Sequence, residues 1–189
     1  MIRTLITMAV ALLLATPCKS QEHIAFMNIP LGGPAGEFVE KLAEEGFVVH
    51  GENPDGILLK GPIAGKDCTL LVRITPETQT VYRVDASFPV RGDWRSCKGD
   101  YTVLQNALTA KFGKPKRLER FEAPFREGDN CELSHLNMGL CKWLSTYSSP
   151  AGTITLSIRP VIVSNGQAAI VYEDKAGSAI LTEEVSRIL

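Results

Sequence analysis

A strict alternation of side chains marks residues 78–88 as a strand with one buried face. One set of alternating positions holds Tyr82, Val84, Ala86 and Phe88, and the set between them is more polar. A period of two is typical of a strand that covers a core on one side. Shorter runs predict three earlier strands at 47–50, 57–60 and 68–75. This part of the chain is therefore predicted to form a four-stranded meander.

Two helices are predicted where apolar residues recur at intervals of three and four. The first covers 34–45, beginning with a proline and ending before Gly46. The second is longer, covers 93–112, and is ended by Gly113 and Pro115. Its apolar positions are Trp94, Cys97, Tyr101, Leu104, Leu108 and Phe112.

The second half of the chain repeats the strand pattern and ends in a helix. Strands are predicted at 117–123, 140–148, 153–163 and 168–172, with a hairpin turn at Asn165 and Gly166. The final helix, 178–189, is expected to give Leu181, Val185, Ile188 and Leu189 to the core. Strands joined by hairpins and separated by single helices predict an α+β fold with antiparallel sheet and helices on one face.

Residues 21–189 are therefore predicted to form one α+β domain, in which 30–92 and 93–189 are candidate duplicated halves. The string TLLVRI at 69–74, followed by VYRVD, resembles TLSIRP at 155–160, followed by IVYED. The order of elements is helix, four strands, helix, four strands, helix.

Residues 1–20 have the layout of a secretory signal peptide. Arg3 precedes an apolar run of eleven residues at 5–15, and small residues lead to a cleavage position before Gln21. A membrane-spanning helix needs about 20 apolar residues, so the run fits a cleaved leader. The domain is expected to be periplasmic or extracellular. A lipid anchor on Cys18 is the alternative, which the preceding Pro17 disfavours.

Four cysteines follow the leader, and an even number in an oxidising compartment predicts two disulfides. Strand positions favour Cys68 with Cys97 and Cys131 with Cys141, although other connectivities remain open. A zinc site is the alternative, since Cys131, His135 and Cys141 are suitable ligands. Their spacing matches no familiar zinc pattern and a fourth ligand is missing. No metal and no cofactor is therefore expected.

The charge of the domain argues against nucleic acid as a partner. The chain has 20 basic and 21 acidic residues, and cleavage removes Arg3 and Lys19, so the domain carries a net charge of −3. One stretch is nevertheless basic and is a candidate for an acidic polysaccharide or lipid headgroup. A solvated helix end is the alternative interpretation. The stretch comprises Lys111, Lys114, Lys116, Arg117, Arg120 and Arg126.

Trp143 and Tyr147 fall on one side of their predicted strand, where they are a candidate platform for stacking a sugar ring. The other side of the strand is mostly polar, which favours burial of the two aromatic rings in the core.

Signs of catalysis are weak. The sequence has no Gly-x-Ser-x-Gly elbow, and paired cysteines would leave no thiolate nucleophile. An exported hydrolase would have to use scattered carboxylates such as Asp85, Asp93 or Asp129.

Several strings of the chain resemble a family of exported proteins of gut anaerobic bacteria to which no activity is assigned. They are NIPLGGPAGEFVEKLAEEGF, GPIAGKDCTLLV, VDASFP, KFGKP, GTITLSI and VYEDK. The resemblance implies export and a shared fold, and it brings no catalytic or binding residues. The predicted order of elements is also similar to tandem helix-plus-four-strand modules of the β-lactamase-inhibitor-protein type, which bind other proteins.

The sequence thus favours a non-catalytic binding module of the periplasm or cell surface, with a protein or glycan partner. A structural component of the cell envelope and an exported hydrolase with paired carboxylates are the alternatives.

Overall fold

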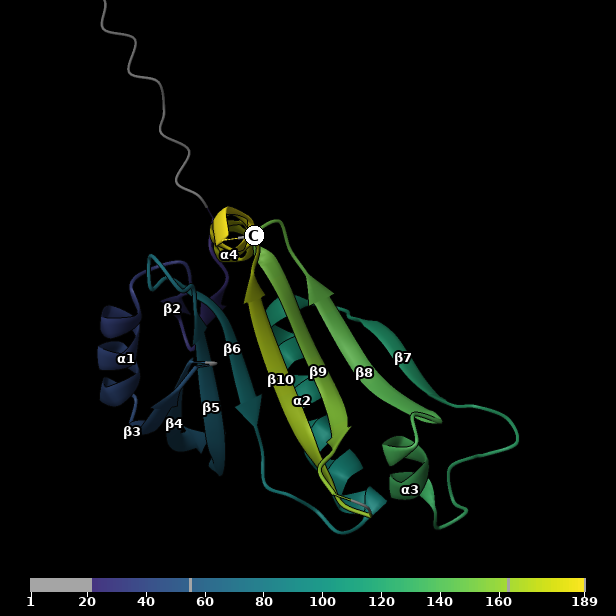
Figure 1. Ribbon diagram of the computed structural model, residues 1–189. Coiled ribbons are helices and arrows are strands. Elements are labelled where there is room, and N and C mark those ends of the chain that lie inside the picture. The colour runs from purple at the N-terminus through teal and green to yellow at the C-terminus, as the bar shows by residue number, and fades with distance from the viewer. Residues whose placement is uncertain (1–21, 55, 163, 189) are drawn as a thin grey trace, which may run out of the picture.

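The chain folds around one eight-stranded antiparallel sheet with helices packed against it, which confirms the predicted α+β class (Figure 1). The computed structural model describes residues 22–54, 56–162 and 164–188. The strands are β1 (Ala25–Phe26), β2 (Ile29–Pro30), β3 (Val48–Asn53), β4 (Gly56–Ile63), β5 (Lys66–Ile74), β6 (Val81–Ser87), β7 (Lys116–Phe121), β8 (Cys141–Ser148), β9 (Gly152–Pro160) and β10 (Gly166–Asp174). The helices are α1 (Ala35–Glu44), α2 (Trp94–Phe112), α3 (Glu132–Asn137) and α4 (Lys175–Ile188).

Two four-stranded meanders meet at the centre of the sheet. The strand order is β3-β4-β5-β6-β10-β9-β8-β7, so the last strand of each meander pairs with the last strand of the other. In this central pair Ala86 of β6 lies opposite Ile170 of β10. Each meander follows a helix in the sequence, α1 or α2, as the pattern predicted. The small β1–β2 pair and α3 are additions to the predicted order.

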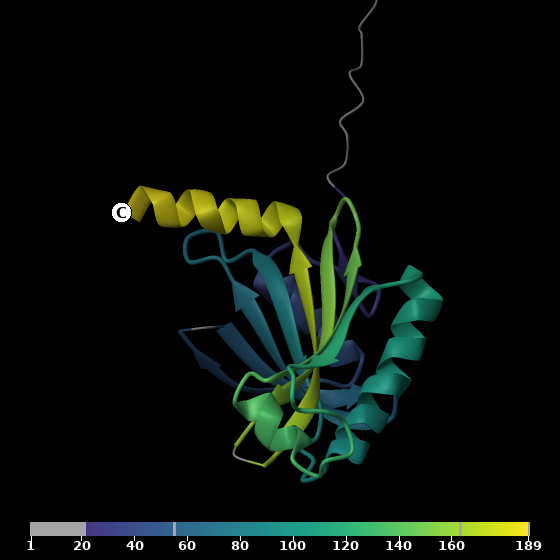
Figure 2. The ribbon, with the colours of Figure 1, turned by 90° about the vertical axis from the view of Figure 1, so that its right-hand side faces the viewer.

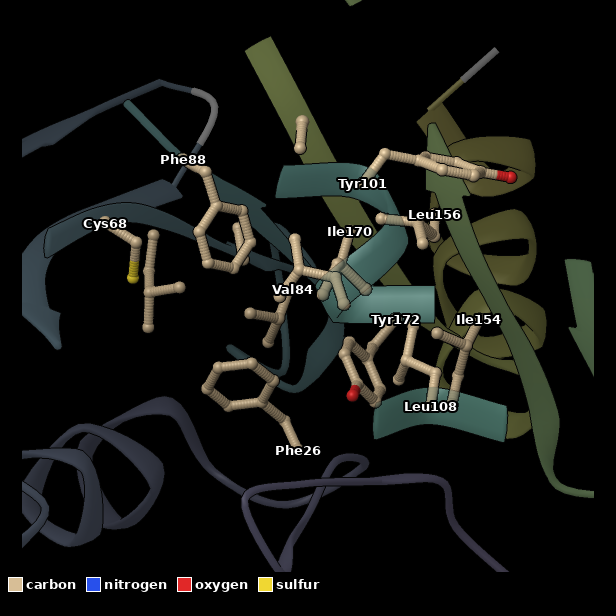
Figure 3. Close-up of a cluster of buried hydrophobic side chains, with 14 of the residues drawn as sticks. Phe26, Cys68, Val84, Phe88, Tyr101, Leu108, Ile154, Leu156, Ile170 and Tyr172 are labelled. Carbon is tan, nitrogen blue, oxygen red and sulfur yellow. The ribbon is translucent and has the colours of Figure 1, made fainter. Parts of the chain in front are cut away.

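The apolar core lies between one face of the sheet and the segments α1, α2 and β1–β2. Alternate strand residues point into it, among them Val84, Leu156 and Ile170, which are at most 4% exposed (Figure 3). The N-terminal segment adds Phe26, whose ring meets Tyr172 edge-on with 5.2 Å between centroids. Burial of each such side chain contributes roughly 1.5–3 kcal/mol, so this face of the sheet supplies most of the stability.

The ends of α2 follow from its sequence. The Asp93 carboxylate accepts a hydrogen bond from the Ser96 backbone N–H at 2.8 Å, which satisfies one of the free donors of the first turn. Gly113 ends the helix with a φ of 80°, a conformation that glycine adopts without strain. Most of the predicted face of α2 is buried, whereas Phe112 is 37% exposed.

Two local predictions differ from the structure. The sequence predicted no helix between the strands at 117–123 and 140–148, and this segment contains α3. Tyr82 is only half-buried, because a register shift between Arg73 and Ile74 turns Val81 toward the core instead.

The last helix also differs from its prediction. It begins at Lys175, and its buried residues are Ala176, Gly177 and Glu184, whereas Val185 is 40% exposed. Leu181 is half-buried. The side chain of residue 188, all of residue 189, the leader at 1–20 and Cys18 lie outside the described residues. Within the described ranges, no helix has the length and apolar character needed to cross a bilayer.

Candidate binding face of the sheet

The face of the sheet turned away from α2, here called the open face, carries mostly polar and charged side chains. Figure 2 shows α2 on one side of the sheet, with α4 projecting from its upper end on the other side. Strand alternation decides which residues point this way, since those between the core positions face outward. The central strands place there Thr69, Leu71 and Arg73 of β5, Arg83, Asp85 and Ser87 of β6, Ala169, Val171 and Glu173 of β10, and Thr155, Ser157 and Arg159 of β9.

Three arginines surround one aspartate at the centre of the open face; we call them and Asp85 the arginine cluster. Arg83 donates to the Asp85 carboxylate from Nη2 at 2.8 Å and from Nε at 3.0 Å, and Arg73 Nε donates at 2.8 Å. The Nη1 atom of Arg159 lies 4.0 Å from the carboxylate, and its Nε donates to Ser157 Oγ at 3.3 Å. The carboxylate is thus held by two arginines, and Arg159 stands beside them.

The charges of the cluster do not balance. The Asp85 side chain is only 10% exposed, and burial opposes its ionisation, but hydrogen bonds and charge from Arg83 and Arg73 outweigh this and hold its pKa below the ordinary value. Burial lowers the pKa of Arg159 most, attraction to Asp85 raises it, and repulsion from Arg83 and Arg73 lowers it. Glu173, 48% exposed and 4.0 Å from Arg83, is a weak fourth partner. The cluster itself contains three arginines and one aspartate.

A hollow of about 770 Å³ lies beside the arginine cluster on the same face. Its polar lining includes Lys60, Thr69 and Ser87, which occupy outward positions on β4, β5 and β6. The apolar part includes Val48 and Val90, which are 70% and 50% exposed. Further apolar lining comes from Pro62 and Pro89. The hollow therefore combines hydrogen-bonding groups with an accessible apolar surface.

The structure distributes the predicted basic stretch over several surfaces. On β7, Lys116 and Arg120 face the open side, opposite Thr146 and Lys142 of β8, while Arg117 points to the other side. Lys111 belongs to α2 and donates to Asn28 Oδ1 at 3.1 Å. Lys114 lies between α2 and β7, and Arg126 in the loop that follows β7.

Trp143 and Tyr147 are core residues on the covered face, with exposures of 9% and 4%. Trp143 meets Trp94 edge-on at 5.2 Å, and the Tyr147 hydroxyl donates to the Gln105 carbonyl at 3.1 Å. The sugar platform is therefore excluded, and the alternative interpretation of buried rings is correct.

All four cysteines in the described part of the chain are free thiols, so neither predicted disulfide is present. Cys68 lies on β5 opposite Gly61, whereas Cys97 packs against Gly166 at the β9–β10 hairpin. Cys131 is exposed at the start of α3, while Cys141 is buried on β8. The sequence did not show that α3 lies between Cys131 and Cys141. It also did not show that Cys68 and Cys97 contact different parts of the sheet.

The alternative sites for chemistry are not assembled. Residues 22–54, 56–162 and 164–188 contain no group of three or more His, Cys, Asp or Glu able to hold a metal, so Cys131, His135 and Cys141 do not form one. Asp93 caps α2, and Asp129 accepts from the Cys131 backbone N–H at 3.0 Å. Asp85 is held by arginines. Each carboxylate has a separate structural partner.

The sequence predicted Asp85 only as a scattered acid, and its pattern did not indicate the three arginines around it. One signal was present: Arg73 and Arg159 occupy the same place in the similar strings TLLVRI and TLSIRP. Comparison of the chain with models of known protein families, with curated proteins and with solved structures finds no match in any of the three.

Proposed function

We propose that this chain is a non-catalytic, exported binding module that receives a macromolecular partner on its open face. The observation that carries the proposal is the arginine cluster, which places three guanidinium groups, each 29–39% exposed, at the centre of the open face. Arginine is enriched where proteins bind one another, because its planar fork makes several hydrogen bonds while its stem packs.

The dimensions of the open face suit such a role. Its eight strands hold six to nine residues each. At about 4.8 Å between strands and about 3.3 Å per residue, they cover on the order of 900 Å². A stable protein interface buries about 800 Å² on each partner, so this face alone is large enough.

The described groups offer little support for catalysis. The thiols of Cys68 and Cys141 are buried, and desolvation raises the pKa of each to about 12, so neither is an activated nucleophile. A binding role accounts for the uncovered polar face and requires no reacting group.

Site-specific photo-crosslinking in cells that produce the full chain tests this function. A photoreactive residue replaces Thr155 on the open face in one variant and Asn106 on the outer surface of α2 in the other. We expect a discrete crosslinked product from position 155 and none of that product from position 106. Equal products from both positions, or none from position 155, would contradict binding through the open face.

Catalysis is tested on the purified domain with panels of glycoside, ester and peptide substrates. Turnover that disappears when one acid or histidine is replaced in a still-folded variant would refute a non-catalytic role.

A further inference from the structure

Arg159 keeps hydrogen-bonding capacity that the arginine cluster does not use. The Asp85 carboxylate already accepts three hydrogen bonds of 2.8–3.0 Å from Arg83 and Arg73. Arg159 comes no nearer to it than 4.0 Å. Its charge is partly desolvated, and Asp85 attracts it while Arg83 and Arg73 repel it. The guanidinium therefore has unused capacity for a carboxylate, which it can bind with two parallel hydrogen bonds.

Neighbouring cations extend this positive surface across the sheet. Arg120 of β7 lies opposite Lys142 of β8. Lys142 lies two residues before Leu144, which pairs with Ser157, so it faces the same side of the sheet as Arg159. Arg120 and Lys142 thus add positive charge to the open face on β7 and β8. An acidic partner meets complementary charge there as well as at Arg159.

The hollow supplies the second half of a recognition site. Thr69 of β5 and Ser87 of β6 line the hollow and lie opposite each other on neighbouring strands. The next pair of residues that faces outward is Leu71 and Asp85. Two residues along a strand span about 7 Å, so the hollow begins close to Asp85, whose carboxylate Arg159 approaches to 4.0 Å. A segment that carries an acidic residue near an apolar one can therefore reach both parts.

The composition of the face favours a protein over a glycan. The outward positions named above for β5, β6, β9 and β10 hold no aromatic ring, although sugar-binding surfaces commonly stack rings on aromatic side chains. Val48 and Val90 instead offer exposed apolar contacts, which suit an aliphatic or aromatic residue of a polypeptide.

Building on the proposed function, we infer that the open face binds an acidic segment of a partner protein, with a carboxylate on Arg159 and a nearby apolar side chain in the hollow. The segment carries Asp or Glu close to an apolar residue.

Selection from a library of random short peptides on the immobilised, purified domain tests this inference. We expect enriched peptides to contain the acidic and apolar pair, and to bind less tightly as the salt concentration rises. The variant Arg159→Gln should weaken binding of a selected peptide by about tenfold, the scale of one charge-assisted contact. Val90→Ser should also weaken binding. The matched control Arg95→Gln, on the exposed side of α2, should change affinity by less than about twofold.

The folding of Arg159→Gln is measured separately by urea unfolding. The variant should show a cooperative transition and be folded under the binding conditions, so that lost binding is distinguished from unfolding.

Each other result counts against the inference. Neutral or basic peptides, or equal binding by Arg159→Gln, would overturn the acidic partner, while a crosslink from position 155 would still support binding through the open face. Binding of polygalacturonate that depends on Arg159, without peptide enrichment, would replace the protein partner with an acidic glycan. Absence of both peptide and polygalacturonate binding would overturn the inference entirely.

Discussion

Arg159 of β9 lies with Nη1 4.0 Å from Oδ1 of Asp85 on β6, although β10 runs between the two strands. The arginine side chain has to cross β10 to reach this place. Ala169 and Val171 of β10 point to this face and are only 1% and 6% exposed, which is consistent with the arginine side chain lying over them. The cluster is therefore a layer of long polar side chains lying across the centre of the sheet.

Replacing the carboxylate at the centre should destabilise the fold. In Asp85→Asn, three guanidinium groups lose the negative charge that holds them together. Removing one partner of a fully buried ion pair costs about 3–5 kcal/mol, and here we expect about 2–3 kcal/mol because the arginines keep contact with water. Urea unfolding measures the loss. Ser157→Ala, on the same face, should cost less than about 1 kcal/mol.

A double variant tests the cause of that loss. If repulsion among arginines is responsible, Arg159→Gln should recover part of the stability lost in Asp85→Asn. Additive losses from the two substitutions would instead show that Arg159 stabilises the cluster.

The contribution of Asp85 should depend on pH in one direction. Its pKa is lowered in the folded state, so its stabilising effect is complete above the pKa of the unfolded chain, about 3.9, and is lost as the pH falls through the lower folded value. The difference in unfolding free energy between the native protein and Asp85→Asn should therefore be constant from about pH 5 to pH 8 and shrink below about pH 4. A difference that grows on acidification would contradict the assigned shift.

Replacing two helical glycines with alanine should change the stability of the fold in opposite directions. Gly99 in α2 has open space around it, so Gly99→Ala should stabilise by up to about 1 kcal/mol. At Gly177 in α4, an added Cβ would lie 2.9 Å from the Cα of Tyr82, closer than folded proteins allow. Gly177→Ala should therefore lower the thermal unfolding midpoint and loosen α4 from β6. A stabilised Gly177→Ala variant would show that α4 does not pack on β6 in this way.

Local patterns in the sequence predicted the parts of the fold that depend on neighbouring residues. The period of two located β6, and the recurrence of apolar residues together with Gly113 located α2. The helix α3 was missed because six residues are too few to show a helical period. The arginine cluster was missed for a different reason: it depends on the pairing of β6 with β10, strands separated by the whole of α2 and three further strands.

Thiol reactivity tests the state of the cysteines, which the sequence and the structure describe differently. Cys131 is exposed, whereas Cys68, Cys97 and Cys141 are buried, and desolvation raises their pKa values to about 12, 11 and 12. Since only thiolates react quickly, Cys131 should be labelled first by an aromatic disulfide reagent in the native protein near neutral pH. The other three should react only after denaturation.

The variant Cys131→Ser distinguishes this reactivity from that of any other thiol, because it should remove one equivalent of fast labelling and leave the slow equivalents unchanged.

The cellular compartment also affects the state of the thiols. The predicted leader would take the chain into an oxidising compartment, where an exposed thiol is the first to be oxidised. The three buried thiols lack both access and thiolate character, so they should persist in protein isolated from its native location. If denatured, unreduced protein from that source contains no reactive thiol, the cysteines are paired, and the segments that carry them must lie closer together than the structure places them.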